Sequence, residues 1–132
     1  MIDTVKCDRM AGFLIGAQQL GYSLNNAWDL LLSSEQGNGL LNDEYAYAVH
    51  HQGIATAEKA DASIGFKYKK GKPKNVNIDQ MLLLANFIEF TNKTFNVPYK
   101  DIFKKISIQD FMKTCGAVLG NYDDKLVKGY IL

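Results

Sequence analysis

The chain has 132 residues and a formal net charge of +1, and 47% of its residues are hydrophobic. That length suffices for one domain with a buried core, and the small charge excludes a global attraction to nucleic acid or anionic lipid. Nothing near the N-terminus resembles a signal peptide, and no stretch has the roughly 18 consecutive apolar residues that a membrane helix needs. Cys7 and Cys115 are far apart and form no CxxC pattern. We therefore expect a cytoplasmic protein with reduced thiols and no membrane contact.

The first half of the chain predicts three helices and a short fourth one. Apolar residues recur at helical spacing over residues 8–20, where Gly12 and Gly16 lie on one face and indicate close packing against another helix. A second helix follows, a third covers residues 42–51, and the alanine-rich residues 53–62 predict a short fourth helix. The expected boundaries are Ser23 or Asn25 as the cap of the second helix, Asn42 as the cap of the third, and residues 35–39 as the loop between them.

A change of pattern at residues 63–78 predicts a small β-hairpin. Ile64, Phe66 and Tyr68 alternate with glycine and lysine, which is the two-residue period of a β-strand. A turn-like sequence, KKGKPK, comes next, and a shorter alternation, NVNI, follows it. The hairpin would be rich in lysine and would lie in the middle of the chain.

The second half predicts one long helix and several short ones. Asp79 can cap a helix over residues 80–95 whose apolar residues fall on nearly every side, and this pattern is typical of a central buried helix. Pro98 suits the first position of a short helix, and Ser107 can cap a further helix that Gly120 ends. These patterns together predict a mainly α fold, a single compact domain of six to seven short helices with a small central lysine-rich β-hairpin.

An internal duplication is one interpretation of the order of elements. Within the single domain of residues 1–132, two three-helix units, 9–53 and 80–122, would be joined by the hairpin of residues 63–78. The matching segments are WDL (28–30) with KDI (100–102), and AV (48–49) with AV (117–118). Two unrelated amphipathic trios of helices would align about as well, so duplication and chance both stay open.

The segment DLLLSSEQGNGLLNDEYAYAVHHQG, which follows the first predicted helix, carries a family resemblance. Residues 9–53 resemble a small uncharacterised helical family of bacteria whose members are often encoded beside ADP-ribosyltransferase-like proteins. The residues that carry the resemblance are Leu31, Tyr45, Tyr47, His50, Gln52 and Gly53. The resemblance implies a helical fold and an antitoxin-like or accessory role, and it brings no catalytic residues with it.

The two histidines of the chain, His50 and His51, are adjacent near the end of the third predicted helix. Neighbouring helical residues point about 100° apart, so the pair cannot easily share a metal ion, and further ligands are lacking. We therefore expect no metal site. Asp43 and Tyr47 lie on the same helix face as His50 and can pass a proton to it, which makes His50, Tyr47 and Asp43 weak catalytic candidates. The other interpretation is a half-buried histidine favoured by the helix dipole, beside an exposed one.

Five lysines fall within the eight residues that follow Phe66. They are Lys67, Lys69, Lys70, Lys72 and Lys74, and Tyr68 lies among them. This arrangement is typical of a segment whose lysines contact phosphates while aromatic rings stack on bases. Because Arg9 is the single arginine of the chain, we expect non-specific rather than sequence-specific binding. The alternative is a solvated hairpin edge on which lysine prevents aggregation.

The chain contains no GxSxG, HExxH, GxGxxG or P-loop pattern, which leaves it without a known catalytic signature or cofactor motif. The leading hypothesis is therefore a small protein-binding module of bacterial or mobile-element origin, acting as an inhibitor or antitoxin-like accessory protein. We expect a protein partner or self-association, because the large apolar residues exceed what one small core needs. The interface candidates are Trp28, Phe87, Phe90 and Tyr130. Non-specific nucleic-acid binding is the second hypothesis, and an enzyme is the third.

Overall fold

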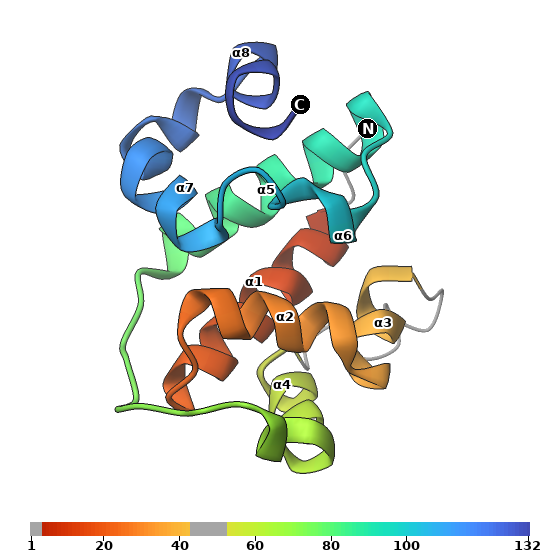
Figure 1. Cartoon of the computed structure of the whole chain (residues 1–132), viewed down its shortest axis with the longest axis vertical. Helices are drawn as coiled ribbons and strands as arrows, with labels where there is room; N and C mark the ends of the chain where they lie inside the picture. The colour runs from red at the N-terminus through yellow and green to blue at the C-terminus, as the bar shows by residue number, and fades with distance from the viewer. Residues whose placement is uncertain (1–3, 43–52) are drawn as a thin grey trace.

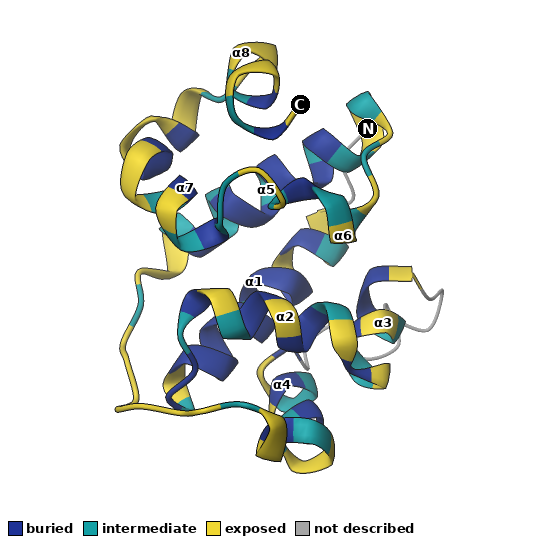
Figure 2. Ribbon diagram, in the orientation of Figure 1, coloured by how far each residue is buried: buried dark blue, intermediate teal, exposed yellow. Residues whose placement is uncertain are grey.

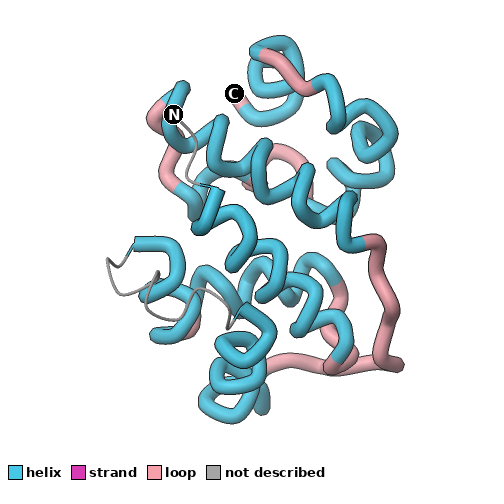
Figure 3. Tube along the Cα trace, turned by 180° about the vertical axis from the view of Figure 1, so that it is seen from behind, coloured by secondary structure: helices cyan, strands magenta, loops and turns pink. Residues whose placement is uncertain are grey.

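The first helix, α1 (Thr4–Gln19), lies at the centre of the molecule (Figure 1). The structure is a computed structural model that describes residues 4–42 and 53–132. The other α-helices of these residues are α2 (Leu24–Ser33), α3 (Glu35–Asn42), α4 (Gly53–Ile64), α5 (Ile78–Phe95), α6 (Tyr99–Ile102), α7 (Ile108–Cys115) and α8 (Asp124–Leu126). Helix α4 packs on one side of α1 and α5 on the other, while α2 crosses α1 (Figures 1 and 3). The mainly α fold that the sequence predicts is confirmed.

Glycines allow α1 and α4 to approach each other closely. A Cβ atom added to Gly53 would lie 2.7 Å from the backbone oxygen of Arg9 and 3.0 Å from the Cα of Gly12. A Cβ added to Gly16 would lie 3.0 Å from the Cα of Ile54. Contacts this short with backbone atoms would force the helices apart. The close packing that Gly12 and Gly16 predict is therefore confirmed, and α4 is the helix they pack against.

Helix α5 covers the opposite side of α1. The thiol of Cys7 donates a hydrogen bond to the backbone oxygen of Ala85 over 3.8 Å, and Nε2 of Gln18 donates to Sδ of Met81 over 3.6 Å. The core lies along this contact (Figure 2), while Leu82 and Leu83 of α5 are half-buried and pack against it. The sequence pattern of residues 80–95 is typical of a central buried helix; α5 does pack against α1 and the C-terminal segments, but α1 is covered by more of the helices.

Aromatic rings fill the core between α5 and the C-terminal helices. Phe87 stacks on the ring of Phe111 with centroids 4.9 Å apart, and Trp28 meets Phe103 edge to face at 5.5 Å. Such pairs stabilise a core by about 0.5–1.5 kcal/mol beyond the burial of their area. The chain ends in a 3₁₀ turn (Gly116–Asn121), α8 and a π-helical turn (Val127–Ile131) that pack in the same region.

Two of the four interface candidates are core residues, and the other two are half-buried. Trp28 is 6% exposed and Phe87 is fully buried. Phe90 and Tyr130 are half-buried, and each packs against another aromatic ring of the core. All four side chains therefore contact the aromatic core, and Phe90 and Tyr130 also keep part of their surface exposed.

No strand occurs among the described residues, so the predicted β-hairpin of residues 63–78 is wrong. Helix α4 continues to Ile64, a 3₁₀ turn (Gly65–Lys67) follows, and the chain then runs as a loop to Asn77, which caps α5. In a strand, Ile64 and Phe66 would lie on the same face and be buried to a similar degree. In the structure, Phe66 is 83% exposed while Ile64 is half-buried. None of the described helices combines the length and apolar character that crossing a membrane requires.

Candidate functional site

The segment between α4 and α5 carries the densest positive charge of the described chain. We call residues 66–76 the lysine loop. The side chains of Lys67, Lys69, Lys70, Lys72 and Lys74 are all exposed, and Phe66 at the start of the loop is 83% exposed. The five lysines predicted to bind nucleic acid thus lie together on the surface, on a loop rather than on a hairpin.

Two backbone hydrogen bonds fix the lysine loop to the end of α1. The N–H of Gly71 donates to the oxygen of Gly21 over 2.8 Å, and the N–H of Lys74 donates to the oxygen of Gln18 over 3.0 Å. Gly21 has a φ of +100°, and a Cβ there would lie 2.3 Å from the oxygen of Gly71. Only glycine fits this position, because an L side chain would meet both backbone strain and the loop.

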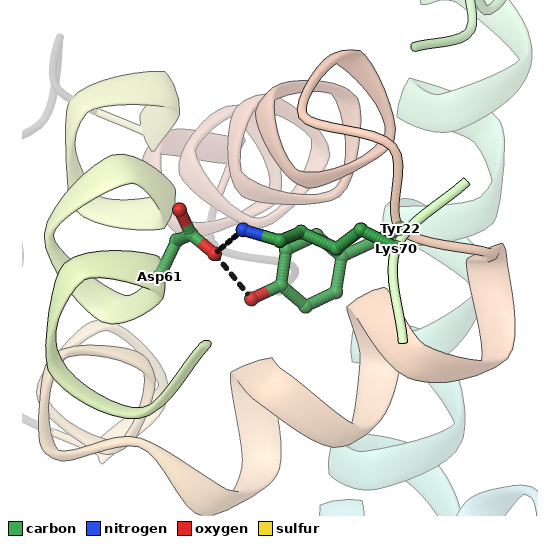
Figure 4. Close-up of polar contacts among 3 residues, drawn as sticks. All are labelled: Tyr22, Asp61 and Lys70. Atoms are coloured by element: carbon green, nitrogen blue, oxygen red, sulfur yellow. Dashed lines mark hydrogen bonds and ion pairs between the residues drawn. The ribbon is translucent and has the colours of Figure 1, made fainter. Parts of the chain in front are cut away.

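A carboxylate on α4 fixes one lysine of the loop from the other side (Figure 4). The hydroxyl of Tyr22 donates to Oδ1 of Asp61 over 2.6 Å, and Nζ of Lys70 donates to the same oxygen over 2.9 Å. The ammonium of Lys70 also lies 5.8 Å from the ring centroid of Tyr22. These three residues come from the α1–α2 turn, from α4 and from the loop, so they join three segments of the chain.

Tyr68 provides the same kind of anchor towards α2. Its hydroxyl donates to Oδ2 of Asp29 over 2.7 Å, and its ring lies 5.6 Å from the ring of Tyr22 at an angle of 52°. Tyr68 was predicted to stack on bases, but its ring packs against a neighbouring tyrosine and its hydroxyl is bonded. The residue therefore holds the loop in place.

The protonation states of this cluster follow from its geometry. Burial, together with the bond to Asp29, raises the pKa of Tyr68 to about 12. Burial and the contact with Asp61 raise the pKa of Tyr22 as well. Burial alone would raise the pKa of Asp61, but the hydrogen bonds from Tyr22 and Lys70 and the charge of Lys70 outweigh it, and the pKa is lowered. At neutral pH the tyrosines are thus neutral donors and Asp61 is an anionic acceptor.

The positive charge of the loop is only partly neutralised. Lys70 pairs with Asp61, whereas the other four lysines make no ion pair with any carboxylate of residues 4–42 and 53–132. A depression of about 340 Å³ lies where the loop meets the start of α2. Its lining residues are Gly21, Ser23, Asn26, Lys69, Lys70, Gly71 and Lys74. The arrangement suits an anion, because the lining contains three lysines and no carboxylate.

The remaining predicted site residues lie elsewhere. Asp43, Tyr47 and His50 fall outside the residues that the structure describes. Within the described ranges, no three or more His, Cys, Asp or Glu side chains gather as metal ligands would. Gly53, one of the residues on which the family resemblance rests, is buried against α1 and has a packing role.

Sequence reasoning missed the residues that hold the loop. Tyr22 and Asp61 are 39 residues apart, as are Asp29 and Tyr68, so no local pattern joins either pair. One available signal was Gly21 directly after a predicted helix, which indicates a left-handed turn where another backbone can approach. Comparison of the chain with protein families, curated proteins and solved structures gives no match.

Proposed function

We propose that the protein binds single-stranded nucleic acid without sequence specificity, through the lysine loop. The observation that carries this proposal is the set of four exposed lysines that lack a carboxylate partner in the described chain, on a loop held in place by backbone bonds and by Asp61. Lysine ammonium groups attract phosphates and release counterions from them, which supplies most of the affinity in non-specific binding.

Phe66 favours single strands over duplexes. Its ring is 83% exposed and directly precedes Lys67, so a base can stack on the ring while its phosphate approaches the lysine. Stacking of one base on an aromatic side chain is worth about 1–3 kcal/mol and does not depend strongly on the base. Bases in a duplex are already stacked and do not offer this face.

The anchoring of the loop supports the affinity of the proposed interaction. A flexible lysine segment would lose conformational freedom on binding, and this loss would weaken the complex. The bonds at Gly71 and Lys74 and the contacts of Tyr68 and Lys70 already restrict the loop. The absence of sequence specificity follows from the arginine content, because Arg9 is only 2% exposed and cannot reach base edges from the core.

The protein-binding hypothesis, including an inhibitor or antitoxin-like role, stays a prediction, and of its four interface candidates Phe90 and Tyr130 are half-buried. Trp28 and Phe87 are core residues, so a partner would contact Phe90, Tyr130 or other apolar groups such as the exposed Phe66. The enzyme hypothesis with His50, Tyr47 and Asp43 also stays a prediction, since its residues lie outside the described ranges.

The test is fluorescence anisotropy with a labelled single-stranded oligonucleotide at increasing salt. Each phosphate contact contributes a slope of about −0.7 in log affinity against log salt, so four lysines give roughly −3. Affinity should then fall roughly 50-fold between about 50 mM and about 200 mM salt. Phe66→Ala should weaken binding to single strands by roughly tenfold and binding to duplexes much less.

A matched pair of variants separates the loop from total charge. The first changes Lys67, Lys69, Lys72 and Lys74 to Gln, and the second changes Lys93, Lys113, Lys125 and Lys128, which are also exposed. Both remove the same number of positive charges. The first should abolish binding and the second should leave most of it. Equal losses in the two variants, or no binding of the wild type at about 50 mM salt, would contradict the proposal.

A further inference from the structure

The depression between the lysine loop and the start of α2 lies where these two segments of backbone are joined. The backbone bond from Gly71 to Gly21, 2.8 Å long, joins the loop to the α1–α2 turn, and both residues line the depression.

The charges that line the depression select a compact anion. Lys69 and Lys74 make no ion pair with a described carboxylate, while the charge of Lys70 is shared with Asp61. Lysine is a compact point charge with three donors, which suits the oxygens of a phosphate group. At neutral pH a phosphate monoester carries between one and two negative charges, more than the single charge of a phosphodiester.

Side chains rather than helix-end amides would make the contacts. The first turn of α2 points its positive end towards this region, which favours an anion. Three of its N–H groups are already bonded, however. Asn25 donates to Oε1 of Gln109 and Asn26 to Oγ of Ser23, each over 3.1 Å, and Ala27 donates to the backbone oxygen of Ser23 over 2.8 Å. The available donors are the ammonium groups of Lys69 and Lys74 and the side-chain amide of Asn26, which lines the depression.

We infer that this depression binds the terminal phosphate monoester of a nucleic-acid strand. The inference rests on the proposed function and makes it more specific: the exposed lysines and Phe66 hold the body of the strand, and the depression holds its phosphorylated end. Free phosphate shares the same chemistry, so the experiment includes it as a separate probe.

The experiment compares oligonucleotides of one sequence by anisotropy. One pair carries either a phosphate or a hydroxyl at the 5′ end with the label at the 3′ end, and a second pair reverses the two ends. We expect the phosphorylated strand of at least one pair to bind at least about tenfold more tightly, because a terminal phosphate adds charge-assisted hydrogen bonds. Inorganic phosphate should reduce this preference by competing for the depression.

Two double variants of the lysine loop are compared. One removes two lysines that line the depression, and the other, the control, removes two lysines outside it. Lys69→Gln with Lys74→Gln should remove the preference for the phosphorylated end, whereas Lys67→Gln with Lys72→Gln should weaken both strands of a pair equally and keep the preference. All four side chains are exposed, so neither variant disturbs the core.

The outcomes distinguish failure of the terminal-phosphate site from failure of nucleic-acid binding as a whole. Equal affinity for phosphate and hydroxyl ends, with salt-dependent binding retained, would overturn the terminal-phosphate site and leave nucleic-acid binding in place. A preference that survives Lys69→Gln with Lys74→Gln would also overturn it. Failure of every strand to bind at about 50 mM salt would overturn nucleic-acid binding itself.

Discussion

Asn25 and Gln109 exchange hydrogen bonds between two helix starts. The side-chain oxygen of each residue accepts from the backbone N–H of the other, over 3.1 Å in both directions, although 84 residues separate them in sequence. Asn25 lies in the first turn of α2 behind the cap Ser23, and Gln109 lies in the first turn of α7 behind the cap Ser107. The pair thus satisfies donors that a helix leaves open and joins the two halves of the chain.

Removing this exchange should reduce stability. Asn25→Ala and Gln109→Ala should each lower the free energy of unfolding by about 1 kcal/mol, because each breaks one bond and loosens the second. The double variant should lose less than the sum of the two, since both changes act on one interaction. Urea denaturation measures all three. Asn75→Ala is the control, because the exposed side chain of Asn75 makes no hydrogen bond within the described chain. A strictly additive double variant would show that the two contacts are independent.

The α1–α4 contact should not accept a methyl group. Gly53→Ala places a Cβ 2.7 Å from the backbone oxygen of Arg9, so α4 has to move and the free energy of unfolding should fall by about 1–3 kcal/mol. Gly120→Ala is the matched control, since no atom beyond the neighbouring backbone lies within 4 Å of a Cβ there. Thermal unfolding should separate the two variants. Equal stability of both would mean that the helices do not approach as closely as the structure has them.

Gly21 and Gly71, which are joined by a backbone hydrogen bond, should respond differently to substitution by alanine. Gly21→Ala should cost at least about 2 kcal/mol, because its φ of +100° disfavours alanine and its Cβ would meet the oxygen of Gly71. Gly71→Ala should be nearly neutral, since its Cβ would lie 3.9 Å from the oxygen of Gly21. The measurement is chemical denaturation, combined with limited proteolysis at the lysines. Only the Gly21 variant should show faster cleavage in the loop.

High pH should destabilise the fold, because the pKa of Tyr68 is raised in the folded state. The pKa of Tyr68 is raised to about 12 in the folded state, while the unfolded state titrates near its ordinary value of about 10. Between these values the unfolded chain loses the proton and the folded chain keeps it, so stability is full below the unfolded pKa and falls as pH rises. In Tyr68→Phe the alkaline slope of unfolding free energy against pH should be smaller by up to about 1.4 kcal/mol per pH unit. An unchanged slope would contradict the raised pKa.

Low pH should weaken the contacts of Asp61, the residue of α4 that bonds to Tyr22 and Lys70. The pKa of Asp61 is lowered in the folded state, so its contribution to stability is present above its unfolded pKa and is lost as pH falls through the folded one. Asp61→Asn should cost about 1–3 kcal/mol at neutral pH, and the variant should lose less stability than the wild type below about pH 4. Unfolding curves across this range test both statements. Asp79→Asn is the control at an exposed carboxylate without a described ion pair.

Helix positions and several caps could be predicted from the sequence because they depend on nearby residues. Ser23 and Ser107 cap α2 and α7 as predicted, each accepting from a backbone N–H three residues later. The glycine-rich residues 35–39 were predicted as a loop but begin α3, because Ser34 accepts from the N–H of Gly37 and burial of the following leucines outweighs the low helix propensity of glycine.

The charge of the lysine loop could also be predicted, but its shape could not. Lysine clustering is visible in the sequence itself, whereas the loop conformation depends on Asp29, Asp61 and Gly21, which approach it only in the folded chain. The predicted hairpin was wrong for the same reason. A local alternation of residues cannot compete with bonds to three distant segments.

Because α1 is synthesised before the helices that cover it, its apolar surface stays exposed for part of the synthesis. The ribosome releases α1 before any of the helices that cover it, and α5 follows only with residues 78–95. At about 5–20 residues per second, the chain from residue 20 to residue 88 takes roughly 3–14 s to appear. During that time the apolar side of α1 that later faces α5 is available to chaperones or to other nascent chains. A product that stops before α5 would keep this side uncovered, and cellular proteases should remove it.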